Sequence, residues 1–67
     1  MVKVIEEFVC DCDCRDFKLE DGTVLYQCDW NGEKYIVKKD GKEVEYTPVY
    51  SYNIPNDYYQ IVGFEVN

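Results

Sequence analysis

The residues of this chain best suited to chemistry are its cysteines, which stand at positions Cys10, Cys12, Cys14 and Cys28. Four thiolates can bind a tetrahedral zinc ion, but zinc sites usually bring cysteines in pairs separated by two to four residues. Here the first three are separated by one residue each. In a strand these three side chains share one face with Cα atoms roughly 6.5 Å apart, too widely spaced for Zn–S bonds of about 2.3 Å.

The spacing favours packing over chemistry for these cysteines. Asp11 and Asp13 alternate with them, as expected of a half-buried strand, and a buried thiol packs as a small hydrophobe. Neighbouring carboxylates also disfavour the reactive thiolate. We therefore expect core cysteines and no cofactor, with a zinc site or a disulfide as the alternatives.

The usual catalytic sets are missing from the sequence. There is no histidine, so neither a Cys-His nor a Ser-His pair can form, and Ser51 is the only serine. No phosphate-binding glycine motif occurs. We expect no catalytic residues and no enzyme activity.

Size and composition predict a single folded domain over residues 1–67. Hydrophobic residues make up 46% and aromatic residues 16%, which is more than disordered chains contain. A domain this small often needs a staple or a second copy for stability, so a homo-oligomer is one expectation. No secretory signal or membrane-spanning stretch is recognisable, and we expect a cytoplasmic protein with no membrane partner.

The charge is strongly acidic, with 14 acids against 7 bases and a net charge of −7. Direct binding to nucleic acid needs a basic surface, so the composition argues against it and favours a basic protein partner. The acids gather in the first third of the chain. Asp11, Asp13 and Asp16 are the candidate partner-binding carboxylates there.

Three dipeptides punctuate the chain as hairpin turns: Asp21-Gly22, Asn31-Gly32 and Asp40-Gly41. They predict an antiparallel meander. Its strands are expected at 14–19, 23–30, 33–39 and 42–50, with further strands at 2–14 and 58–66. The fold class is therefore all-β, with about six short strands in a curled sheet or partly open barrel. Gly63, inside the last strand, marks a bend or a close backbone approach.

Pairing outward from the three turns predicts a consistent register. The expected pairs are Phe17 with Tyr26, Leu19 with Val24, Cys28 with Tyr35, Tyr35 with Tyr46 and Val37 with Val44. All these side chains fall on one face, which we expect to form the core. Leu25 and Ile36 fall among the polar side chains of the other face.

A tyrosine-rich stretch follows the meander. Tyr50 and Tyr52 share one face of an extended chain and lead to Tyr58. They are expected either to close the open end of the barrel or to form a contact surface, since tyrosine is enriched at interfaces. Pro48 lacks a donor, which favours an edge strand.

These features favour a non-catalytic interaction module, a small acidic inhibitor or adaptor that binds a basic protein. By analogy, such domains occur in phages and mobile elements. An alternative is an oligomer that binds a nucleotide-like ligand, with phosphate held by Lys38, Lys39 and Lys42 around the third turn. A second alternative is a zinc-stapled structural domain.

Overall fold

The computed structural model describes residues 1–9, 11, 14–53, 55 and 58–67. Six antiparallel strands form one sheet, and the predicted all-β architecture is confirmed. The strands are β1 (Val2–Val9), β2 (Arg15–Leu19), β3 (Val24–Leu25), β4 (Tyr35–Lys39), β5 (Lys42–Asn53) and β6 (Tyr58–Val66). A 3-10 turn, η1 (Gln27–Asp29), lies between β3 and β4. Within the described part of the chain, no helix has the length and apolarity to cross a membrane.

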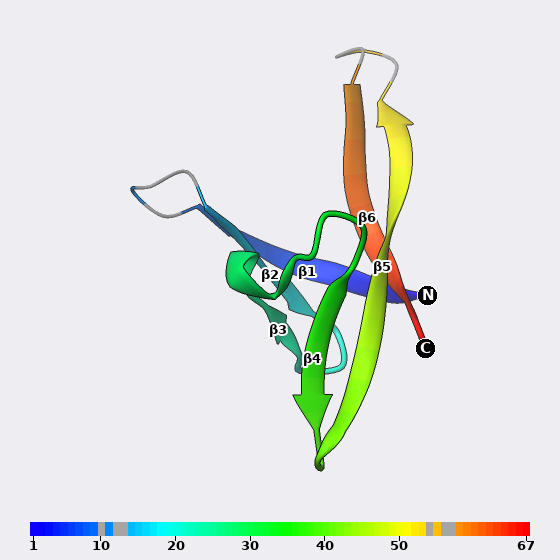
Figure 1. Ribbon diagram of the computed structural model, residues 1–67. Coiled ribbons are helices and arrows are strands. Elements are labelled where there is room, and N and C mark those ends of the chain that lie inside the picture. Colours follow the sequence, from blue (N-terminus) through cyan, green and yellow to red (C-terminus); the bar gives the residue numbers. More distant parts are fainter. Residues whose placement is uncertain (10, 12–13, 54, 56–57) are drawn as a thin grey trace.

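The sheet is a meander bent almost into a closed ring. Its order is β3-β2-β1-β6-β5-β4, so nearly every strand lies beside its neighbour in sequence, and β1 lies beside β6. The ring is interrupted between β3 and β4, where an isolated bridge joins Trp30 to Tyr35. Figure 1 shows the resulting barrel-like shape, with β4 and β5 crossing in front of β1 and β2.

The core is small and largely aromatic. Its buried side chains come from β2 to β6 and are Phe17, Leu19, Leu25, Tyr35, Tyr46 and Phe64. The ring of Phe64 stands edge-on to Phe17 and Tyr35, with ring centroids 5.7 and 5.6 Å apart. Val2 and Val4 pack against this cluster from β1. Every strand thus contributes to one core.

The third predicted hairpin is confirmed residue by residue. Tyr35 pairs with Tyr46 and Val37 with Val44 across β4 and β5. Asp40 and Gly41 both have positive φ, 52° and 78°, as a two-residue type I′ turn requires.

The register of the first hairpin was predicted wrongly by one residue. Phe17 lies opposite Leu25 rather than Tyr26, and Lys18 opposite Val24. The turn contains three residues instead of two, because the Leu19 N–H donates to the Thr23 carbonyl at 2.8 Å. One slip exchanges the two faces of a strand. Leu25 is therefore buried, and Tyr26 is 51% exposed.

The predicted strand over 23–30 is also wrong beyond Leu25, where η1 replaces it. The carboxylate of Asp16 accepts the Gln27 N–H at 3.1 Å and anchors this turn to β2. The side-chain oxygen of Asn31 accepts the N–H groups of Glu33 and Lys34, both at 2.9 Å. These local bonds take the place of the expected ladder between Cys28 and Tyr35.

Pro48 in β5 and Gly63 in β6 each occupy a position that their backbone chemistry explains. Pro48 lies in β5, which has strands on both sides, but the pairs with β4 end at Tyr46, so Pro48 pairs only toward β6. At Gly63 an added Cβ would come within 2.7 Å of the Val2 carbonyl oxygen. The close backbone approach predicted at Gly63 is therefore confirmed.

Candidate functional site

Two hairpins separate at one end of the barrel. The β1–β6 pairs are Val2 with Phe64 and Lys3 with Gly63, and no further pair joins the two strands within the described residues. Just beyond this point the β1–β2 register shifts around Ile5, and the β5–β6 register shifts around Val62. Such bulges bend and twist a strand. The β1–β2 and β5–β6 hairpins therefore diverge, as Figure 1 shows, and we call the space between β1 and β6 the split.

The split is hollow on both faces of the sheet. The inner groove, of about 480 Å³, is lined by Glu7, Val9, Arg15, Phe17, Tyr50, Tyr58, Tyr59, Gln60 and Ile61. A second hollow of about 410 Å³ lies between Lys3–Glu7 of β1 and Gln60–Val62 of β6. Glu7, Gln60 and Ile61 line both spaces. The barrel wall is thus incomplete at the split.

Most of the large exposed apolar side chains lie on these two hairpins. The members are Ile5, Phe8 and Val9 on β1 and Tyr50, Tyr52, Tyr58 and Tyr59 on β5 and β6. Tyr59 is the most exposed, at 70%, and its ring lies 5.1 Å from that of Tyr52. The expectation that the tyrosines close the open end of the barrel is therefore wrong. They cover the surface beside the split.

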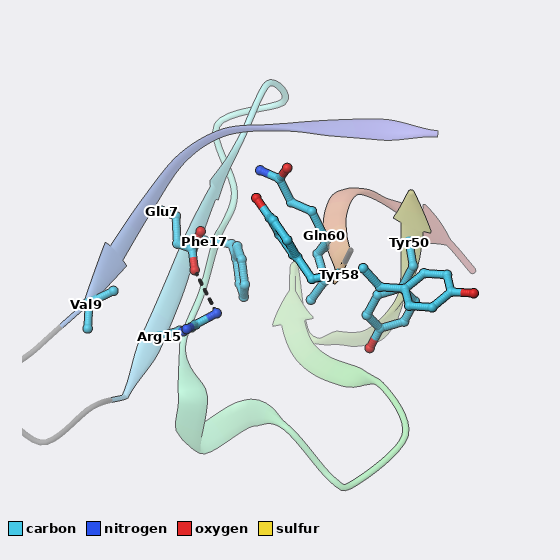
Figure 2. A pocket seen from close by; sticks show the side chains of 9 residues that line it. Glu7, Val9, Arg15, Phe17, Tyr50, Tyr58 and Gln60 are labelled. Carbon is cyan, nitrogen blue, oxygen red and sulfur yellow. Dashed lines mark ion pairs between the residues drawn. The ribbon is translucent and has the colours of Figure 1, made fainter. Parts of the chain in front are cut away.

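A single ion pair lies in the inner groove among the residues that line it. Arg15 approaches Glu7 at 3.4 Å, and both side chains are well exposed. Figure 2 shows this pair on the β1–β2 side, with Tyr58 and Gln60 extending toward it from β6. An exposed pair of this kind contributes about 0–1 kcal/mol, so a ligand can displace it at little cost.

Charges of both signs line the split. Glu6 and Glu7 lie on β1 beside Lys3, and Arg15 lies on β2. Asp11 is exposed at the turn after β1, and the protein as a whole carries a net charge of −7. From Thr47 to Asn67 the sequence contains no lysine or arginine. A positively charged ligand would therefore be attracted by the whole molecule and would meet no basic side chain on this part of the β5–β6 hairpin.

The predicted acidic site is only partly assembled. Asp11 is exposed at the turn after β1, and Asp13 lies outside the described residues. Asp16 is half-buried, and its hydrogen bond to η1 gives it a structural role.

Tyr35 of the core has a raised pKa. Its burial is the largest cause, and Tyr50 and Asp16 add smaller contributions.

The cysteines do not gather in the described structure. Cys28 is exposed in η1, so the prediction that it packs in the core is wrong, because the chain leaves the sheet after Leu25. Cys14 is half-buried just before β2. Cys10 and Cys12 lie outside the described residues. Among the residues that are described, no three Cys, Asp or Glu side chains group as metal ligands.

The predicted lysine site is divided. Lys38 and Lys39 line a hollow along the β3–β4 interruption together with Tyr26 and Asp29, but Lys42 does not. Lys39 donates to the hydroxyls of Tyr46 and Thr23 and lies 3.7 Å from Asp21.

The bonds of Lys39 belong to a polar network with Tyr46, Thr23 and Asp21, which closes the end of the barrel opposite the split. Donation to Tyr46, together with the charge of Asp21, raises the pKa of Lys39. Burial alone would raise the pKa of Asp21, but hydrogen bonds from Thr23 and the charge of Lys39 hold it below its ordinary value. Lys39 is thus already engaged within the protein.

Sequence reasoning missed six residues of the inner groove: Glu7, Val9, Arg15, Tyr59, Gln60 and Ile61. A signal for them was present. Strict alternation of apolar residues fails at Ile5 and again at Ile61-Val62, where a bulge changes which residues face inward.

No protein-family model, no curated protein and no solved structure matches this chain.

Proposed function

We propose that this protein is a non-catalytic binding module that holds a basic segment of a partner protein in the split between its two hairpins. The observation that carries the proposal is the inner groove, where exposed tyrosines from one hairpin face acidic and apolar side chains from the other. The inhibitor or adaptor role expected from the sequence is one use of such a module.

The surface chemistry of the two hairpins supports recognition of another protein. Tyrosine adds large contact area at low conformational cost and also offers a hydroxyl for hydrogen bonds. Isolated exposed apolar residues are ordinary, but contiguous ones beside a groove indicate an interaction surface. Tyr50, Tyr58 and Tyr59 line the same groove, so they form such a contiguous set.

Charge selects the kind of partner. The protein carries a net charge of −7, and the carboxylates of Glu6 and Glu7 line the split together with Lys3 and Arg15. Complementary charge speeds encounter and excludes acidic partners. A lysine- or arginine-bearing segment is therefore the favoured ligand.

The nucleotide-like ligand is a weaker candidate. The hollow that contains Lys38 and Lys39 also contains the carboxylate of Asp29, and Lys39 is engaged with Asp21. A phosphate there would have to compete with both carboxylates.

Titration with a short peptide of alternating lysine and valine tests the proposal. We expect binding by the wild-type protein and at least about tenfold weaker binding by Glu6→Lys, a loss of about 1.4 kcal/mol, because Glu6 lines the split. The matched control is Glu43→Lys, which makes the same charge change on β5 near the opposite end of the barrel. Equal weakening by the two variants, or no binding by the wild type, would contradict the proposal.

A further inference from the structure

We infer that the basic segment binds as an added strand, hydrogen-bonded through its backbone between the free edges of β1 and β6. This inference rests on the proposed function and goes beyond it by naming the conformation of the ligand. An extended peptide that completes a sheet gains affinity from main-chain hydrogen bonds and specificity from alternate side chains.

The first observation is that two strand edges are left open where the hairpins diverge (Figure 1). After Lys3, the edge of β1 that faces away from β2 has no described strand partner. Before Gly63, the edge of β6 that faces away from β5 has none either. An unpaired edge presents a row of N–H and C=O groups that serves as a template for another chain. The open stretch of β6, Tyr58–Val62, would span roughly 17 Å in extended form, enough for a strand of ordinary length.

The second observation is that these edges lack three of the features that protect an edge. Lysines, prolines and very short strands discourage unwanted pairing. The other open edges have them, since β3 contains two residues and β4 ends in Lys38 and Lys39. Residues 4–9 and 58–62 contain neither lysine nor proline, and their protection comes from the carboxylates of Glu6 and Glu7 and from one bulge in each edge. Carboxylates repel an acidic strand but attract a basic one, so these edges are suited to pairing with a basic segment.

The third observation identifies the occupant. A second copy of this chain would bring Glu6 and Glu7 against another strongly acidic molecule, which like-charge repulsion opposes. A basic segment of alternating residues would instead place its lysine or arginine side chains on one face, near Glu7 in the inner groove. The side chains of its other face would contact exposed apolar groups such as Phe8.

The test uses the same peptide of alternating lysine and valine, together with an analogue methylated on alternate backbone nitrogens. Methylation removes N–H donors and keeps the side chains and their charges. We expect the methylated analogue to bind at least about tenfold more weakly. With the unmethylated peptide, we expect amide hydrogen exchange to slow along 4–9 and 58–62, because ladder formation protects those N–H groups.

Each other result has a defined meaning. Equal affinity of the two peptides, both weakened by Glu6→Lys, would overturn the added strand and leave the proposed function standing. Binding by neither peptide would overturn both. If sedimentation instead shows self-association that slows exchange along the same two edges, the occupant is a second copy, and the inference is wrong.

Discussion

The two ends of this barrel are built from the same sheet but in opposite ways. At the closed end, the turns at Asp21-Gly22 and Asp40-Gly41 lie beside a polar network of Lys39, Asp21, Thr23 and Tyr46. At the split end, the strands separate just before two bulges and expose aromatic side chains and backbone edges. The difference assigns stability to the core and the closed end, and the split is where we propose that a partner binds.

The largest expected effect is the loss of an aromatic ring from the core. Phe64→Ala removes a fully buried ring that contacts Phe17 and Tyr35, which should cost about 3–5 kcal/mol. That is close to the whole stability expected of so small a core. Thermal or urea unfolding should show a protein that is largely unfolded at room temperature. Phe8→Ala makes the same change on the exposed β1–β2 hairpin. A similar loss of stability in that variant would contradict the idea that stability resides in the core and the closed end.

A smaller effect is expected where the two ends meet, at Gly63. In Gly63→Ala the new Cβ would collide with the Val2 carbonyl oxygen, so β1 and β6 must move apart. We expect a destabilisation of about 1–3 kcal/mol, the range for overpacking. Amide exchange at Val2 and Lys3 should become faster. Ser51→Ala on neighbouring β5 is the control, and unchanged exchange in Gly63→Ala would show that this junction does not join the hairpins.

The closed-end network should show a modest, pH-dependent effect. Asp21→Asn removes the charge that faces Lys39 and should cost about 0.5–1 kcal/mol at neutral pH. Because folding lowers the pKa of Asp21, its stabilisation is complete above the unfolded-state value of 3.8 and is lost as the pH falls through the folded value. The stability difference between wild type and variant should therefore disappear in acid.

The control for the closed end is Asp40→Asn in the neighbouring turn. Asp40 has a positive φ of 52°, which asparagine tolerates equally well. Its stability difference should stay near zero at every pH. A difference for Asp21→Asn that persists in strong acid would mean that the lost charge is not its cause.

The smallest effect on stability is expected at the split. Tyr59→Ser removes a ring that is 70% exposed, and the free energy of unfolding should change by no more than about 0.5 kcal/mol. Affinity for the basic peptide should nevertheless fall about tenfold. Tyr26→Ser makes the same change beside the β3–β4 interruption and should leave binding unchanged. Loss of stability without loss of binding would reverse the assignment of the two ends.

Local turn chemistry accounts for what could be predicted. Asp40-Gly41 specifies a two-residue turn, and every pair of its hairpin follows from it. At Asp21-Gly22 the same type of dipeptide forms a longer turn, because the Asp21 carboxylate accepts the Thr23 N–H at 2.9 Å. Together with the bond from the Leu19 N–H to the Thr23 carbonyl, this hydrogen bond defines a three-residue turn, which shifts the register and exchanges Leu25 with Tyr26 as the buried residue. The dipeptide alone does not reveal which of the two turns will form.

The sequence by itself determined the all-β fold, the register of the third hairpin, the acidic charge and the lack of histidine. Those properties depend on residue type and on spacing between near neighbours. Only the tertiary structure decided that β1 lies beside β6 and that their pairing ends at Lys3 and Gly63. This pairing joins residues some 60 positions apart through backbone groups common to every residue, so no local pattern specifies it. The split, and the candidate binding site within it, follow from that long-range pairing.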